Sequence, residues 1–389
     1  MTADTRARLL LLALPQMGPA RLAWLLAAAE APAVVDALRA GRVPDGVGDP
    51  PPGVTRAMVS KWQDRIRTAP SRVEGILAAS RELGVTIRSP LDPSWPFADD
   101  PEPPCLLFLI GDPNLLTAPI RVAVVGTRRC TAIGRTVAND LGAELAGAGG
   151  VVVSGLALGV DGAAHRGALE HSDGAVIGVV GSGLDVVYPR ANRPLWDEVG
   201  RRGLLLSEAP TGHRPERWRF PARNRLIAAL SHAVVVVESH ERGGALSTAD
   251  EALRRDRPVM AVPGSVLSPA SRGTNALLID GAVPVRNAGD VLAYLGHPLP
   301  SGSPPAPPEP RPGPGGTAGS ERLPVPGIAH DPIGARILAE VATGPVHLDQ
   351  LVLVTGLTVA DVLAAVQTLQ AAGLVDLDGS TVLFRSGSA

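Results

Sequence analysis

Between residues 120 and 296, short apolar runs alternate with helical segments, and this alternation limits the fold more than any other feature. The runs are Val122–Val125, Val151–Ser154, Val176–Gly181, Leu204–Ser207, Val234–Glu238, Val259–Pro263 and Ala282–Val285. Uninterrupted runs of β-branched and apolar residues fit strands that are buried on both faces of a parallel sheet. The alternation therefore predicts the α/β class, as an open, doubly wound parallel sheet with helices on both faces.

The first of these strands leads into a glycine turn and a helix, within RVAVVGTRRCTAIGRTVAND (residues 121–140). Gly126 allows a tight turn, Thr127 can bond an anion, and Arg128 brings a guanidinium to the strand's carboxyl end. Free N–H groups and the helix dipole favour an anion at such a point. Many glycine turns merely close a βα unit, however, and this one is neither a G-x-G-x-x-G fingerprint nor a Walker A loop.

The later strands also end in glycines and polar residues. These are Ser154-Gly155, Gly181-Ser182-Gly183, Ser207-Glu208, Glu238-Ser239 and Pro263-Gly264. In a doubly wound sheet the carboxyl ends share one edge, and ligands bind there. Several glycine turns and hydroxyls on one edge strengthen the prediction of an anion site.

A second signal is the concentration of arginine in residues 188–225. This segment holds nine arginines against four acidic residues, and Tyr188, Trp196, Trp218 and Phe220 lie among them. Cations for the backbone and aromatic faces for unstacked bases are what a single-stranded nucleic acid requires. The alternative is a solvated surface over core aromatics.

Composition argues against a membrane protein, a disulfide-rich protein and a cysteine metal cluster. The 389 residues suffice for two or three domains, and no apolar run approaches the roughly 20 residues of a membrane span. Two cysteines, Cys105 and Cys130, cannot form a disulfide framework or a metal cluster, which fits a reducing cytoplasm. Lys61 is the single lysine, so phosphate recognition would depend on guanidinium groups.

Residues 1–84 read as a helical domain. LLALPQMGPARLAWLLAA resembles a helix-hairpin-helix or sterile-alpha-motif-like (SAM-like) unit that turns at Gly18-Pro19. Such hairpins hold a DNA phosphate or serve as plain packing units, and Pro19 lacks the N–H that would help with a phosphate. From residue 85 to 119 the chain is punctuated by proline. We expect it to dock through Trp95 and Phe97 and to add a strand within PPCLLFLIGD.

The C-terminal part divides into a linker and a small domain. Residues 298–327 are too rich in Pro, Gly and Ser to fold alone. Within 328–389, three helical segments followed by GLVDLDGSTVLF predict a winged helix. The segment from Asp331 to Phe384 contains one basic residue, Arg336, and six acidic residues, and its third helix carries no cation. A module without cations lacks the phosphate contribution to affinity, so we expect it to contact protein rather than duplex DNA.

Catalytic patterns are weak. Asp161 and His165 stand at i and i+4 near a helix start, and Ser154 lies close in sequence, but no nucleophile elbow or third partner accompanies them. A structural use of Asp161 and His165 is the simpler interpretation, with Asp161 favouring the helix dipole. No metal-ligand spacing is present. We therefore expect no catalytic residue, no metal and no cofactor.

Taken together, the motifs resemble the DNA processing protein A (DprA/Smf) family. The matching segments, between about residues 100 and 296, include VAVVGTRRCTAIG, VVVSGLALGVDGAAHRGAL, VIGVVGSGLDVVYPRANRPL, GLLLSEAPTGHRPERWRFPARNRLIAALSHAVVVVES, GGALSTADEALRRDRPVMAVPG and SRGTNALLIDGA. The resemblance implies an extended Rossmann-like domain (residues 85–297) that dimerises, binds single-stranded DNA and loads the RecA recombinase in transformation or recombination. It implies no catalytic turnover.

The resemblance also implies the site. Arg128, in GTR, matches an arginine that clamps a DNA phosphate, and Arg190, in YPRAN, stands where the family has a basic residue on the DNA. The full set of expected DNA-binding residues is Gly126, Thr127, Arg128, Ser154, Gly155, Arg190, Asn192, Phe220, Arg223 and Asn224. Two departures bear on affinity: GGAL (residues 243–246) replaces a commoner Ser-Gly pair, and Thr127 replaces a serine.

Two other functions stay open at this point. Nucleotide-processing relatives of the phosphoribohydrolases also use a Gly-Gly turn before a helix, and GGALSTADEAL could fill that position. The chain lacks their full PGGxGTxxE pattern. The other alternative is an interaction scaffold whose phosphate site is vestigial.

Overall fold

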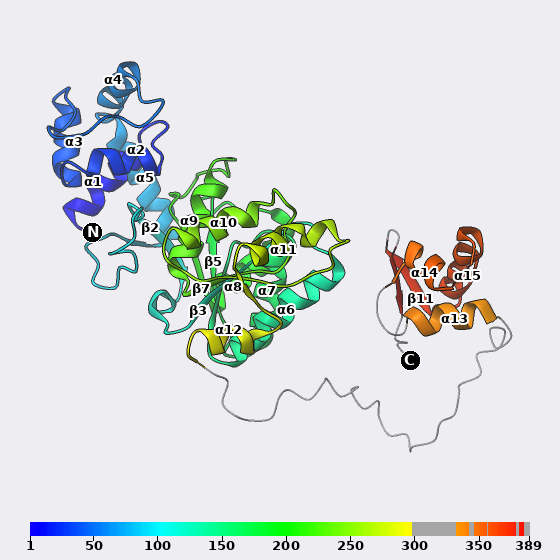
Figure 1. Ribbon diagram of the computed structural model, residues 1–389. Coiled ribbons are helices and arrows are strands. Elements are labelled where there is room, and N and C mark those ends of the chain that lie inside the picture. The colour runs from blue at the N-terminus through cyan, green and yellow to red at the C-terminus, as the bar shows by residue number, and fades with distance from the viewer. Residues whose placement is uncertain (298–331, 342–345, 356, 379–380, 385–389) are drawn as a thin grey trace. The chain divides into compact units, whose positions relative to one another are not determined.

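The computed structural model describes residues 1–297, 332–341, 346–355, 357–378 and 381–384. The chain forms two compact units, residues 1–303 and 304–389, so the N-terminal helices and the sheet share one unit (Figure 1). The linker predicted at 298–327 lies outside the described residues.

The sheet of residues 1–297 has nine strands in the order β1-β2-β6-β5-β4-β3-β7-β8-β9. Their bounds are β1 Thr86–Arg88, β2 Leu107–Gly111, β3 Arg121–Val125, β4 Val151–Ser154, β5 Ala175–Val180, β6 Leu204–Ser207, β7 Ala233–Val236, β8 Val259–Ala261 and β9 Val283–Pro284. All neighbours from β6 to β9 are parallel. The seven strands that the apolar runs predict are therefore all present.

Helices cover both faces of the sheet, as the doubly wound prediction requires. They are α6 Ala132–Gly147, α7 Val160–Glu170, α8 Arg193–Arg202, α9 Arg219–Leu230, α10 Gly244–Leu253, α11 Arg272–Ile279 and α12 Ala288–Tyr294. Side chains of α6, α7, α8 and α12 share one core with Val122 and Val124 of β3. Ala123 and Val125 point to the opposite core, together with α9 and α10. The period-2 alternation of a buried strand thus supplies both layers.

Five helices precede the sheet: α1 Ala3–Leu12, α2 Pro19–Leu26, α3 Ala31–Arg39, α4 Arg56–Arg65 and α5 Ala69–Glu82. α1 and α2 form the expected hairpin, with Gly18 as the N-cap and Pro19 as the first residue of α2. Proline is well suited to that position because the first N–H of a helix has no intrahelical acceptor.

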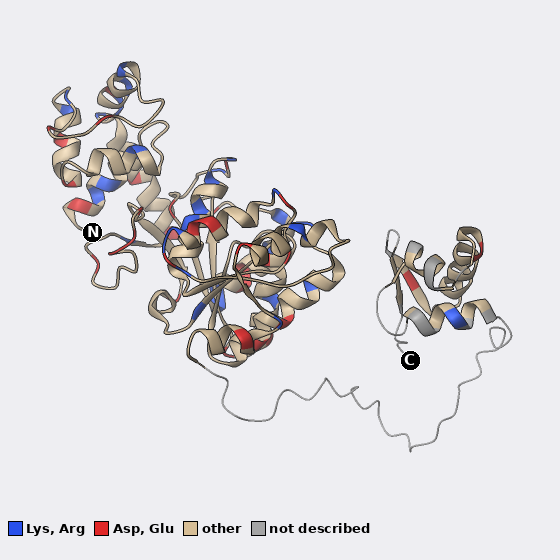
Figure 2. Cartoon of the chain, viewed as in Figure 1, with Lys and Arg blue, Asp and Glu red and all other residues tan. Residues whose placement is uncertain are grey.

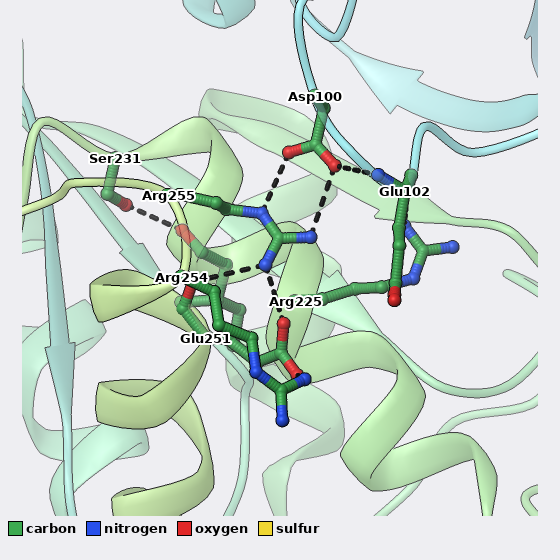
Figure 3. A network of polar contacts seen from close by, with 8 residues as sticks. Asp100, Glu102, Arg225, Ser231, Glu251, Arg254 and Arg255 are labelled. Carbon is green, nitrogen blue, oxygen red and sulfur yellow. Dashed lines mark hydrogen bonds and ion pairs between the residues drawn. The ribbon is translucent and has the colours of Figure 1, made fainter.

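The proline-rich connector is fixed to the sheet. β2 pairs antiparallel with β6, as expected for PPCLLFLIGD, and β1 adds an outer strand that the sequence did not predict. Phe97 is buried and meets Trp95 edge-on, with ring centroids 5.6 Å apart. Figure 3 shows the polar anchor: Arg255, just after α10, lies between Asp100 and Glu251, with Nε 2.8 Å from the Asp100 carboxylate.

The second unit has the predicted winged-helix arrangement. Helices α13 Pro332–Val341, α14 Leu348–Thr355 and α15 Val359–Ala371 precede strands β11 Val375–Asp378 and β12 Thr381–Phe384, and β10 Val346–His347 completes a small sheet. Basic residues (blue) are scarce on this unit in Figure 2. Among the described residues of the chain, no helix combines the length and apolarity needed to cross a membrane.

Candidate nucleic-acid interface

One cation and two aromatic rings meet at the carboxyl end of the sheet. Arg128 follows β3, Tyr188 lies in the loop after β5, and Phe220 is in the first turn of α9. The guanidinium carbon of Arg128 lies 5.0 Å from the Phe220 ring centroid, and the rings of Tyr188 and Phe220 are 5.5 Å apart. These three side chains line a small cavity of about 70 Å³. A cation beside exposed aromatic faces can serve both a phosphate and an unstacked base.

Arg128 and Arg190 are exposed at this edge. Arg190 begins the short helix η2 (Arg190–Asn192), two residues after Tyr188. Within the described residues, no ion pair joins either arginine to a carboxylate. Their charge is therefore available to a ligand.

Several of the nine arginines in the 188–225 segment have internal partners instead. Arg225 pairs with Glu208 at 2.5 Å, and Arg202 donates to the Leu169 carbonyl oxygen at 2.8 Å. Arg219 bonds Glu216 and stacks on Trp218. Fewer of the nine arginines are therefore free to meet a ligand than the sequence suggests, because Arg202, Arg219 and Arg225 hold helices and loops together.

Arg223 is buried behind this surface. Its Nη1 donates to the Val179 carbonyl oxygen at 2.5 Å, at the end of β5. It also occupies the space beside Gly155, where a Cβ atom would overlap Nη1. Burial, and secondarily the charge of Arg128, lowers the pKa of Arg223 to about 10 despite the opposing effect of Asp161. The Arg223 guanidinium thus requires a residue without a Cβ at Gly155, which also lines the cavity beside Arg128.

Asp161 and His165 have structural partners. Asp161 is buried and accepts a hydrogen bond from the Gly155 N–H at 3.1 Å. Burial raises its pKa, while Arg223 opposes that rise. His165 is fully buried, Nε2 donates to the Ile177 carbonyl oxygen at 3.2 Å, and burial lowers its pKa to about 4. Neither side chain faces the Arg128 cavity.

Three more of the expected residues bond within the protein. Ser154 is buried, and its hydroxyl donates to the Val124 carbonyl oxygen at 2.6 Å. Asn192 donates to the carbonyl oxygens of Leu156 and Ala157 at 3.0 Å. Asn224 donates to the Ser247 hydroxyl at 2.8 Å, which links α9 to α10. These contacts hold the loops that present Arg128, Tyr188 and Phe220.

The helix N-terminus predicted to bind an anion carries a carboxylate of the protein itself. Glu238, just beyond β7, accepts bonds from the Thr131 N–H at 2.8 Å and the Thr131 hydroxyl at 2.6 Å, where Thr131 is the N-cap of α6. The Glu238 carbonyl oxygen accepts from the Thr127 N–H at 2.8 Å. Gly134 leaves room for this carboxylate, since a Cβ there would overlap it. The anion site predicted at this helix start is corrected: the protein fills it.

The role of Glu238 was not predicted from the sequence. Glu238 does appear among the polar residues at strand ends, and β7 is the parallel neighbour of β3. An acidic residue at the end of the strand beside the glycine turn was the available signal. With this helix start occupied by Glu238, the exposed Arg128 guanidinium is a cation that this turn presents to the surroundings.

Comparisons with known proteins agree with this fold. Residues 86–296 match the family model for DNA recombination-mediator protein A, and residues 303–377 match the DprA winged helix domain. DNA processing protein DprA of Bacillus subtilis is 41% identical over 223 residues, which are 57% of this chain and 74% of that protein. Its counterpart in Streptococcus pneumoniae is 44% identical over 203 residues, 51% of this chain and 70% of that protein.

A solved structure is also similar. The X-ray structure of DNA processing protein A from Streptococcus pneumoniae is 36% identical, with a TM-score of 0.56, and the match covers 62% of this chain and 83% of that one. Sequence and fold thus agree over the sheet and the helices around it. The chain belongs to the DNA processing protein A (DprA/Smf) family.

Proposed function

We propose that this chain binds single-stranded DNA, without catalytic turnover, at the surface formed by Arg128, Tyr188, Arg190 and Phe220, called here the Arg128 surface. The observation that carries the proposal is the Arg128 guanidinium beside the Phe220 ring, with Tyr188 next to it. The cations would neutralise phosphates, and the rings would stack on bases that no partner strand covers. In a duplex the bases are already stacked and paired, so the rings would add little.

The remaining expected residues would position the Arg128 surface rather than contact the DNA. Gly126 and Thr127 set the turn that carries Arg128, while Ser154, Gly155 and Arg223 fix the floor beneath it. Asn192 and Asn224 would hold the loops of Arg190 and Phe220 in place. Substituting these residues would then weaken binding mainly by moving the Arg128 surface.

The family relationship supports two finer proposals. The protein would load the RecA recombinase onto single strands during transformation or recombination in the cytoplasm, and it would form a homodimer through the unit that contains the sheet. Val266, Leu267 and Ile279 are each more than 80% exposed in that unit. Asn275 of α11 bonds Gly264, which holds the loop of Val266 and Leu267 against the helix that ends at Ile279. Exposed apolar residues of this size favour a protein interface.

Equilibrium binding at several salt concentrations tests the proposed site. Arg128→Ala should weaken binding of single strands of any sequence and lower the slope of log affinity against log salt by roughly 0.7 per lost phosphate contact. Arg201→Ala, at an exposed arginine in the last turn of α8 next to the amino end of β6, is the matched control and should bind as the wild type does. Unchanged affinity and slope for Arg128→Ala would contradict the site.

The same preparation tests the alternatives. A nucleotide-processing enzyme would release free base from nucleoside monophosphates with steady turnover, and that result would contradict the proposal. A scaffold with a vestigial site would bind no single-stranded DNA at low salt. The Glu238 carboxylate at the start of α6 counts against a nucleotide-processing enzyme, because it occupies a position where a nucleotide phosphate would otherwise bind.

A further inference from the structure

A second, larger cavity lies on the other side of the start of α9. Its volume is about 520 Å³, and its lining is mostly apolar. One wall is the α1–α2 hairpin, including Met17, Pro19 and Leu22, and the opposite wall is Trp218 and Arg219 of the α9 start. The floor is formed by the carboxyl ends of β5 and β6. The cavity thus lies on the ligand-binding edge of the sheet, but the helical region closes one side of it.

Three observations give this cavity the character of a ligand site. Trp218 is 45% exposed, and the Arg219 guanidinium carbon lies 4.4 Å from its ring centroid. Arg223 lines both this cavity and the small cavity beside Arg128, so the two hollows are neighbours. Arg223 is only 7% exposed, and its Nε has no hydrogen-bond partner among the described residues. A buried donor without an acceptor is costly, so Arg223 is a lining residue with unused hydrogen-bonding capacity.

We propose that this cavity receives an unstacked base of the same DNA strand that the Arg128 surface holds, and that the helical region is therefore part of the DNA site. The inference rests on the proposed function. Trp218 and Phe220 are two residues apart at the start of α9, so their side chains project to opposite sides of it. Because Arg223 lines both hollows, a strand that crosses the start of α9 would meet Phe220 on one side and Trp218 on the other.

The lining suits a base rather than a phosphate. The flat apolar walls and the indole ring match the face of a base. Every base carries at least one ring nitrogen or carbonyl oxygen that can accept a hydrogen bond from an arginine of the lining. Arg8, Arg219 and Arg223 face Glu102 and Glu208 around the cavity, so the lining is not a strongly cationic phosphate site. The Gly18-Pro19 turn, which the sequence suggested as a phosphate site, lies against the Trp218 ring instead: a Cβ on Gly18 would be 3.7 Å from it.

The inference is tested by measuring how the full chain binds single strands after a substitution on each of the two walls of the cavity. Trp218→Ala removes the stacking ring, and Ala23→Trp fills the cavity from the exposed, lining position on α2 without altering α9. Each should weaken binding of a strand of about 12 nucleotides by roughly five- to a hundredfold. Trp218→Phe should retain most of the affinity. Ala78→Trp, on the exposed face of α5 away from the cavity, is the control for adding an indole.

A fluorescent adenine analogue gives a second readout. Placed at successive positions in the strand, it should be quenched at one or two of them by wild-type protein and not by Trp218→Ala. If Arg128→Ala weakens binding while Trp218→Ala and Ala23→Trp bind like the wild type with the same quenching, the inference fails and the proposed function stands. If the wild type binds no single strand, the proposed function itself fails. Weaker binding by Ala23→Trp with no position quenched would also contradict the base pocket.

Discussion

Burial decides what each charged side chain of this site does. Arg128 and Arg223 are both arginines near the same strand ends, yet Arg128 is exposed and Arg223 lies beneath it with the Val179 carbonyl oxygen and Gly155 around it. The sequence could place Arg128 because its position after a buried strand fixes its location. The sequence could not predict that Arg223 is buried while Arg128 is exposed. The burial of Arg223 depends on Gly155, which is 68 residues away in the chain.

His165 gives a prediction at this scale. It is buried with a pKa of about 4, against 6.5 for an ordinary histidine, because burial disfavours its charged form. Between these values the unfolded chain binds a proton that the native state does not, so His165 makes stability fall as pH decreases from 6.5 toward 4. The free energy of unfolding that His165 can contribute in this way is at most about 3 kcal/mol. His165→Gln should reduce the pH dependence in urea unfolding measured across this window.

The comparison must be between His165→Gln and the wild type, because other groups titrate in the same range. The pKa of His232 is also lowered to about 4, and the pKa of Asp161 is raised, which acts in the opposite direction. These contributions are common to both proteins and cancel in the difference. Identical pH profiles for the two proteins would contradict the assignment to His165.

At the scale of elements, the start of α6 explains both a success and a failure of sequence reasoning. The strand, the turn at Gly126 and the helix are where the sequence predicts them, since the hydrophobic pattern specifies them locally. The anion at the helix start comes from Glu238, whose approach depends on β7 pairing with β3. Strand order is a property of the whole sheet, so the local motif indicated an anion but not its source. The edge strand β1 was missed because three residues carry too short a pattern.

Removing this carboxylate should destabilise the turn that carries Arg128. Glu238→Ala deprives Thr131 of two acceptors at a helix start, and we expect it to lower the free energy of unfolding by about 1–3 kcal/mol. Asn287→Ala, which removes the side-chain N-cap of α12, is a matched loss of a cap at another helix and should cost about 1 kcal/mol. Urea unfolding measures both. A cost for Glu238→Ala no greater than that of the control would indicate that the carboxylate is not needed there.

At the scale of the whole molecule, the chain carries the proposed DNA site and the acidic winged helix in two different compact units. Composition and periodicity predicted the doubly wound sheet and the winged helix, because both depend on repeated local patterns. The cavity between the α1–α2 hairpin and α9 was not predictable, since it arises where segments some 200 residues apart pack together. The winged helix has its own core of Ile337, Leu351 and Val366, separate from the cores of the sheet.

This division predicts that the acidic unit adds little to DNA affinity. A chain shortened to residues 1–303 should fold, because that unit contains its own cores, and should bind single strands within about twofold of the full chain with the same salt slope. Binding titrations of the two proteins side by side make the comparison. A large loss of affinity, with a lower slope, would mean that the winged helix contacts phosphates despite its charge.

The central claim is that an unpaired strand lies on the Arg128 surface, and photocrosslinking tests it most directly. A single-stranded oligonucleotide carrying iodouracil, irradiated with the full-length protein, should crosslink to Tyr188 or Phe220, as identified by mass spectrometry of the digested complex. The crosslink should disappear with excess unlabelled single strand and persist with excess duplex. Crosslinks confined to residues 304–389, or equal competition by duplex, would contradict the account.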